Sequence, residues 1–125
     1  MQYTNICQGT FIDRPNRFIA HINISAETVH VKNTGRCAEL LVPGAVVYVQ
    51  ESDKPDRKTK WDLIAVKKGS RMVNMDSQIP NHLVKEWLEE GNLFKDITRI
   101  RPEYTYGSSR FDLYVEADGK KIFIE

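Results

Sequence analysis

The sequence predicts a mixed α+β protein, in which a five-stranded OB-like β-barrel is followed by a helix and a β-hairpin. Three observations lead to this class. Residues 1–79 contain five short segments with alternating apolar residues, separated by turn residues. Residues 82–90 repeat apolar side chains at helical spacing. Near the end of the chain, Asp118-Gly119 is flanked by two alternating segments, which is a strong hairpin signal.

In the first part of the chain, turn residues separate short strands, as is typical of a small barrel. Turns are expected at Arg14-Pro15-Asn16, Asn33-Thr34-Gly35 and Pro43-Gly44. A short helical turn is expected at 36–41, and residues 72–75 form either a last strand or a linker. The expected strands are 8–13, 17–24, 28–32, 45–51 and 60–67. Among small closed sheets, the OB barrel is the best match in size.

After residue 79 the strand-like pattern gives way to apolar residues at helical spacing. A helix over 82–90 is predicted to begin near Pro80 or Asn81 and to stop at Gly91, which tolerates the left-handed conformation after a helix. A strand over 97–103 and a turn at Tyr106–Ser109 precede the terminal hairpin. We therefore expect one domain in residues 1–79 and the beginning of a second in residues 80–125.

The hairpin register follows from its turn. With Asp118 and Gly119 as a type I′ loop, Ala117 faces Lys120, and each further pair follows. Side chains alternate between faces. The expected core face is Phe111, Leu113, Val115, Ile122 and Ile124. The opposite face is Asp112, Tyr114, Glu116, Lys121, Phe123 and Glu125.

This register places Asp112 opposite Glu125, and directly opposed carboxylates repel each other. A divalent cation with a preference for oxygen ligands, Mg²⁺ or Mn²⁺, would offset that repulsion. Alternatively, both acids are solvated at the open end of the hairpin, where water screens them. The geometry alone leaves both interpretations open.

The composition is that of a soluble globular protein, with 41% hydrophobic and 28% charged residues. A net charge of +1 does not indicate a polyanionic partner, but residues 1–79 carry 11 Lys/Arg and 8 Asp/Glu, against 7 and 9 in residues 80–125. Cys7 and Cys37 fit no metal or redox spacing and are expected to be reduced thiols. With no signal peptide and no membrane-length apolar run, a cytoplasmic protein without membrane contact is expected.

Several motifs are spread along nearly the whole chain in a characteristic order. They are Arg17-Phe18-Ile19-Ala20, His30-Val31-Lys32-Asn33-Thr34-Gly35-Arg36, Pro43-Gly44, Arg57-Lys58 with Trp61-Asp62-Leu63, Pro80-Asn81-His82-Leu83-Val84 and Tyr106-Gly107-Ser108-Ser109-Arg110-Phe111-Asp112. In these motifs the chain resembles the sugar fermentation stimulation protein A (SfsA) family. The resemblance implies an N-terminal OB-like domain and a following restriction-endonuclease-like domain. It also implies DNA binding and a role in regulating sugar-utilisation genes of the maltose type.

The second domain of that family is similar to nucleases with the PD-(D/E)xK pattern. The resemblance assigns the first acid to Asp112, the second to Glu125, and a helical third acid to Glu86, with Glu89 and Glu90 as competitors. Such acids hold Mg²⁺ or Mn²⁺, which activates a water molecule. The lysine of the pattern is expected two positions beyond Glu125. The chain is therefore interpreted as the front of a longer protein, and is expected to be inactive as a nuclease by itself.

Basic residues of the barrel are the candidates for nucleic-acid binding, because OB barrels bind strands in basic grooves with aromatic stacking platforms. The candidates for phosphate contacts are Arg57 and Lys58 first, then Arg17, Arg36 and Lys60. The alternative is an ordinary solvated surface. Trp61 is either a stacking platform or a core residue, and His30-Val31-Lys32-Asn33-Thr34-Gly35 is either a functional loop or a structural turn.

The leading interpretation is thus a largely sequence-non-specific DNA-binding protein, since phosphate contacts carry no sequence information. Its partner would be double- or single-stranded DNA, and a homodimer is left open. The first alternative is a metal-dependent nuclease once the chain is complete. The second is a barrel that binds a protein or a small ligand, in which the basic residues only solvate the surface.

Overall fold

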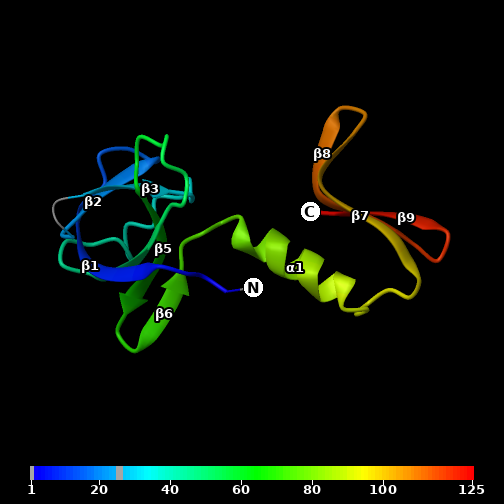
Figure 1. Cartoon of the computed structure of the whole chain (residues 1–125), viewed down its shortest axis with the longest axis horizontal. Helices are drawn as coiled ribbons and strands as arrows, with labels where there is room; N and C mark the ends of the chain where they lie inside the picture. The colour runs from blue at the N-terminus through cyan, green and yellow to red at the C-terminus, as the bar shows by residue number, and fades with distance from the viewer. Residues whose placement is uncertain (1, 25–26) are drawn as a thin grey trace. The chain divides into compact units, whose positions relative to one another are not determined.

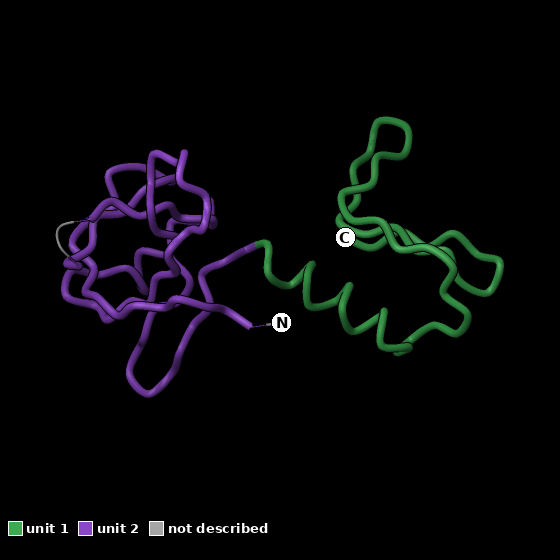
Figure 2. Tube along the Cα trace, viewed as in Figure 1, with its two compact units in different colours: residues 1, 78–125 green, residues 2–77 purple. Residues whose placement is uncertain are grey.

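The computed structural model describes residues 2–24 and 27–125, and it divides into two compact units, residues 2–77 and 78–125 (Figure 2). Each unit has its own hydrophobic cluster. The first unit consists of β-strands, and the second contains a helix and a three-stranded sheet (Figure 1).

The first unit is a closed barrel of five strands. The strands are β1 (Ile6–Asp13), β2 (Ile19–Ile22), β3 (Thr28–Val31), β4 (Val46–Glu51) and β5 (Trp61–Lys68), followed by β6 (Arg71–Asn74). They pair in the order β3-β2-β1-β4-β5-β6, and a parallel pairing of β3 with β5 closes the circle. The predicted OB-like barrel is confirmed, and residues 72–75 largely form a strand, β6, that extends β5 as a hairpin.

Barrel closure depends on β1, which changes partner along its length. Its first part pairs with β4 from Ile6 to Thr10, and its last part pairs with β2, with an irregularity between Phe11 and Asp13. A strand must bend sharply to make this change. Gly9 lies just before the bend, and a Cβ there would come within 2.6 Å of Ile24 Cγ1. The glycine is therefore required by close packing.

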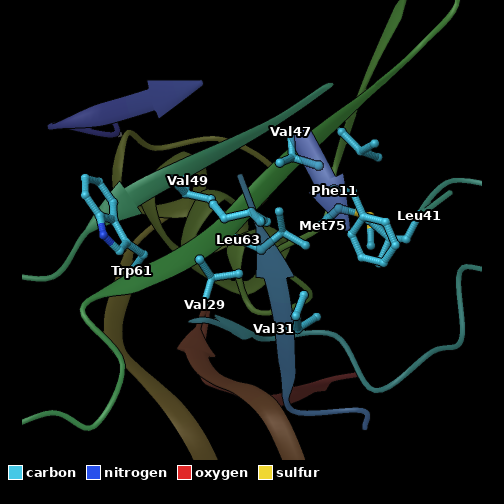
Figure 3. Packing of buried hydrophobic residues seen from close by; sticks show 12 residues of the cluster. Phe11, Val29, Val31, Leu41, Val47, Val49, Trp61, Leu63 and Met75 are labelled. Carbon is cyan, nitrogen blue, oxygen red and sulfur yellow. The ribbon is translucent and has the colours of Figure 1, made fainter. Parts of the chain in front are cut away.

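The barrel interior is filled by the inward residues of all five strands (Figure 3). The buried cluster comprises Phe11, Ala20, Ile22, Val29, Val31, Leu41, Val47, Val49, Trp61, Leu63, Val66 and Met75. Trp61 is only 7% exposed and belongs to this cluster. Its ring is therefore a core element, and no flat face of it is available as a broad stacking platform.

The second unit contains α1 (Ile79–Glu89), β7 (Ile97–Tyr106), β8 (Ser109–Ala117) and β9 (Lys120–Ile124). The helix begins three residues before the predicted start at 82. Pro80 lies in the first turn of the helix, where a backbone N–H has no hydrogen-bond partner within the helix. The helix can therefore begin before Pro80 and include the buried Ile79. As predicted, Gly91 follows the helix end with φ +90°.

The terminal hairpin has the predicted register. Asp118 and Gly119 both have positive φ, +52° and +71°, as a type I′ turn requires. The pairs run from Ala117–Lys120 to Leu113–Ile124. Leu113 and Val115 are buried, and the partly buried Ile122 and Ile124 pack on the cluster formed by Leu88, Val115 and Ala117.

The predicted core face was wrong for Phe111. Its ring lies 4.9 Å from that of Phe123, on the face that also carries the stacked pair Tyr104–Tyr114, whose centroids are 4.2 Å apart. Strict alternation along β8 therefore does not describe the position of the Phe111 ring, which joins the aromatic side chains Tyr114 and Phe123 of the opposite face. On the neighbouring strand β7, Glu103 has φ +52° and departs from extended geometry.

Candidate nucleic-acid interface

The loop between β4 and β5, residues 52–60, carries most of the candidate basic residues. Its two ends are tied together, because the Ser52 amide donates to the Lys60 carbonyl at 2.7 Å. Inside the loop, the Ser52 hydroxyl oxygen accepts from the Lys54 amide at 3.2 Å. The two ends of the loop are thus held together, and the loop between them carries basic side chains.

Arg57 in this loop is bound to Asp62, near the beginning of β5. Its Nη1 donates to Asp62 Oδ2 at 2.9 Å and its Nη2 to Asp62 Oδ1 at 2.6 Å, a two-pronged ion pair; Nη2 also reaches Thr59 Oγ1 at 3.3 Å. The Asp62 side chain is 9% exposed and that of Arg57 27% exposed. A paired geometry of this kind is strong because both partners are charged and aligned.

Asp62 also lies near His30 of β3 and near Lys32, the residue that follows β3. His30 Nδ1 lies 3.4 Å from Oδ1, and Lys32 Nζ lies 3.9 Å from Oδ2 and 3.8 Å from Asp76 Oδ2. Burial by itself would raise the pKa of Asp62, but hydrogen bonds from Arg57 and the charges of Lys32 and Arg57, with a smaller part from His30, outweigh it and lower that pKa. Asp62 is therefore a buried anion at neutral pH.

Two hollows adjoin this anion, and one of them has a surplus of basic residues. A hollow of about 350 Å³ is lined by His30, Lys32, Lys54, Arg57, Lys58, Thr59 and Asp62. A neighbouring hollow of about 270 Å³ shares Lys32, Lys54, Arg57 and Asp62. We call the first of these the cationic hollow, because four Lys/Arg side chains face a single carboxylate there.

The five predicted phosphate-binding residues occupy three places. Arg57 and Lys58 line the cationic hollow. Lys60 pairs with Glu51 at 3.3 Å, and its ammonium nitrogen lies 5.6 Å from the centre of the Trp61 ring. Arg17 and Arg36 line a separate hollow next to the β1–β2 loop. The structure therefore brings four of the five together as two separate pairs and leaves Lys60 apart, and their roles stay a prediction.

Lys32 was not identified from the sequence as a candidate for phosphate binding. It lies in the motif of residues 30–35, for which a functional loop and a structural turn were both left open. It reaches the cationic hollow because β3 pairs in parallel with β5 and His30 lies opposite Asp62. The OB strand order would have indicated this neighbourhood. The adjacent Asn33-Thr34-Gly35 is a structural turn at least, since Asn33 Oδ1 accepts from the Gly35 amide at 2.9 Å.

The acidic pair lies in the second unit. Asp112 is half-buried on β8, and Glu125, exposed, follows the last residue of β9. Continued by one step beyond Leu113–Ile124, the register places the two carboxylates opposite each other. Two carboxylates completed by waters suit the ligand preferences of Mg²⁺ or Mn²⁺. Within residues 2–24 and 27–125, however, no three His, Cys, Asp or Glu side chains gather, so Glu86 does not complete a three-acid group.

Together, the features of the two units define a class of protein. A closed OB barrel with a basic β4–β5 loop is followed by the helix and antiparallel strands that begin a nuclease-like domain. The sequence matches the family model described as "SfsA N-terminal OB domain" over residues 12–75. It matches the model "Sugar fermentation stimulation protein RE domain" over residues 78–125. The chain belongs to the SfsA family.

Curated relatives agree with this assignment. A sugar fermentation stimulation protein homolog of Ruminiclostridium cellulolyticum is 63% identical over 127 residues, covering 100% of this chain and 56% of the relative. A homolog from Clostridium beijerinckii is 60% identical with the same coverage, and one from Desulfitobacterium hafniense is 56% identical, covering 100% of this chain and 55% of the relative. The chain thus spans about half the length of the curated relatives it matches.

A solved structure confirms the fold. The structure of Pyrococcus furiosus SfsA in complex with Ca²⁺ matches with a TM-score of 0.80 and 26% sequence identity, covering 100% of this chain and 55% of that one. The described part of this chain contains no helix with the length and apolarity needed to cross a membrane.

Proposed function

We propose that this protein binds DNA largely without regard to sequence, with the barrel's cationic hollow as the main contact for phosphates. The observation that carries the proposal is the surplus of positive charge there. Lys32, Lys54, Arg57 and Lys58 line the hollow, and Asp62 is the single carboxylate among the lining residues. Concave sites of one charge sign focus the electrostatic field and attract oppositely charged ligands.

The position of the basic residues in the fold supports the proposal. OB barrels bind oligonucleotides on the β2–β3 face and through the β1–β2 and β4–β5 loops. Here the first loop carries Arg17 and the second carries Arg57, Lys58 and Lys60. Arg36 lies in the β3–β4 connection, outside this usual surface, and stays a weaker candidate.

Low sequence specificity follows from the chemistry of the hollow. Lysine ammonium groups bind phosphates as point charges, and phosphate contacts carry no sequence information. Arg57 differs from these lysines, because two of its nitrogens already donate to Asp62 and are less available to a ligand. As part of the same proposal, such binding serves the regulation of sugar-utilisation genes of the maltose type, in keeping with the name of the relatives.

The test is fluorescence anisotropy of labelled duplex and single-stranded DNA, titrated with the chain at several salt concentrations. Three lysines on phosphates predict a log–log slope of about −2 to −3, because each neutralised phosphate contributes about −0.7 to −0.9. The double variant Lys54→Glu/Lys58→Glu should lose most of the affinity. Lys67→Glu, an exposed position on β5, is the matched control. No binding at low salt would instead favour a barrel for a protein or small-ligand partner.

We propose a second function, metal-dependent nuclease activity, for the longer protein only. It is favoured by the β8–β9 register, which, continued by one step, brings Asp112 opposite Glu125, together with a family relative solved in complex with Ca²⁺. Mg²⁺ or Mn²⁺ held there would activate water for attack on the scissile phosphate. In a chain extended beyond Glu125, Asp112→Asn should weaken Mn²⁺ binding and strand cleavage together. Unchanged Mn²⁺ affinity would remove the pair from consideration.

A further inference from the structure

The barrel has another hollow, separate from the cationic hollow. It measures about 460 Å³, within the usual range of small-ligand sites, and lies between the β1–β2 loop and the β3–β4 connection. We call it the loop hollow. Its lining residues are Phe11, Ile12, Asp13, Arg14, Asn16, Arg17, Thr34, Gly35, Arg36, Ala38, Leu41 and Pro43.

The loop hollow combines apolar and charged side chains. Its apolar lining residues are Phe11, Ile12, Ala38, Leu41 and Pro43. Phe11 and Leu41 belong to the barrel core and are 4% and 7% exposed, whereas Ile12 is 45% exposed. A large apolar side chain that stays accessible in a concave site indicates a ligand with an apolar surface.

The walls of the loop hollow are held in place by one side chain. The Arg14 guanidinium donates to the carbonyls of Asn33 (2.5 Å), Gly35 (2.6 Å), Arg36 (2.9 Å) and Arg17 (2.8 Å). These bonds tie the β1–β2 loop to the β3–β4 connection. A site built in advance binds with a smaller loss of conformational entropy than one that forms on binding.

The lining of the loop hollow favours an anion. Arg17 and Arg36 lie in it as exposed residues, and Asp13 is the single acid among the lining residues. That acid is 2.6 Å from His21 Nδ1 and so has a partner of its own. The suitable ligand therefore combines an apolar group with a neighbouring negative charge, and a nucleotide has both.

We propose that the loop hollow receives one unpaired base of a DNA single strand, while Arg17 and Arg36 contact the flanking phosphates. This inference rests on the proposed DNA binding and adds a preference for single strands. A base inside a duplex is stacked and paired and must be extruded at a cost before it can enter a pocket. In a single strand the base is free, so its apolar surface can contact Ile12 and Pro43 without that cost.

The test compares a short oligothymidine with the same strand containing abasic sites, by fluorescence anisotropy at matched salt. The two strands have the same phosphates, so only base insertion distinguishes them. We expect about tenfold weaker binding of the abasic strand, the size of effect typical of one stacked base. The salt slope should be the same for both strands.

Two variants locate the effect. Ala38→Phe places a ring into the loop hollow and should abolish the difference between the strands, while binding of the abasic strand is retained. Val42→Phe adds the same ring at an exposed position outside the lining and should preserve the difference. Arg17→Ser/Arg36→Ser should make the salt slope shallower.

The outcomes distinguish base insertion into the loop hollow from DNA binding in general. Equal binding of intact and abasic strands by the unmodified chain would overturn base insertion and leave DNA binding standing. Absence of binding to either strand would overturn DNA binding itself. A tenfold difference that persists in Ala38→Phe would place the base elsewhere on the barrel and overturn the assignment to the loop hollow.

Discussion

Arg57 and Asp62 form a two-pronged ion pair with nitrogen–oxygen distances of 2.9 and 2.6 Å, and this pair fastens the tip of the β4–β5 loop to the beginning of β5. The same carboxylate lies near His30 of β3 and near Lys32, which directly follows β3. Asp62 is thus a positioning residue: it holds Arg57 of the β4–β5 loop and Lys32 beside the cationic hollow, and its own charge is buried.

Replacing Asp62 should destabilise the barrel. Asp62→Asn preserves the shape of the side chain and removes its charge, which leaves Arg57 and Lys32 without their shared anion. Hydrogen bonds between charged groups contribute about 1.5–3 kcal/mol, so we expect the free energy of unfolding to fall by about 2 kcal/mol. Urea unfolding measures this. Asp53→Asn, an exposed position in the same loop, is the control, and equal losses in the two variants would contradict the prediction.

The contribution of Asp62 should depend on pH in a defined direction. Its pKa in the folded state is lowered, because the Arg57 hydrogen bonds and the nearby positive charges outweigh the opposing effect of burial. The stabilisation is therefore complete above the unfolded pKa of about 3.9 and is lost as pH falls through the folded pKa. The stability difference between the unmodified chain and Asp62→Asn should shrink below about pH 4. A difference that is constant from neutral to acidic pH would mean that the carboxylate charge has no part in it.

Arg14 should contribute to stability through the two loops it joins. Arg14→Met retains much of the side-chain length and removes all four donors to the carbonyls of residues 17, 33, 35 and 36. Most of these bonds are exposed and water can replace them, so we expect a loss of about 1–2 kcal/mol. Hydrogen exchange should become faster in residues 14–18 and 33–36. Arg71→Met, an exposed position on β6, should change neither quantity.

The parts of the structure that follow local rules could be predicted from the sequence. Asp118-Gly119 determined the hairpin register because a type I′ turn accepts few other residues and fixes every pair after it. The helix start at Ile79 was misplaced by three residues because Pro80 was treated as the boundary rather than as part of the first turn. Each of these depends only on neighbours in the chain.

Features that join distant segments were not predicted. The position of Asp62 beside His30 depends on the parallel closure of β3 with β5, which no local pattern encodes. The four carbonyls that meet at Arg14 come from two different loops, and a single arginine in a turn gives no sign of them. Phe111 was assigned to the wrong face because strict alternation was assumed along β8, whereas its ring contacts that of Phe123 on the neighbouring strand.

Gly9 should be intolerant of even a methyl group. An added Cβ would lie 2.6 Å from Ile24 Cγ1 and 3.0 Å from its Cδ1. Overpacking of this kind typically costs about 1–3 kcal/mol, so Gly9→Ala should lower the free energy of unfolding by that amount. The double variant Gly9→Ala/Ile24→Ala should be less destabilised than the sum of the single variants, because the second change removes the clash. Strict additivity in urea unfolding would show that Gly9→Ala acts by another route.

Tyr114 should ionise later than an ordinary tyrosine because of a carboxylate two residues away. Its hydroxyl donates to Glu116 Oε1 at 2.5 Å, and this bond, followed by burial and the Glu116 charge, raises the pKa of Tyr114 to about 12. Glu116→Ala should move that ionisation toward the usual value of about 10, as followed by ultraviolet difference absorbance, with circular dichroism at the same pH to verify the fold. Glu103→Ala, which removes an exposed carboxylate paired with Arg110, should leave the late ionisation in place. Loss of the late step in Tyr114→Phe would assign it to this residue, whereas its persistence in that variant would show that another tyrosine is responsible.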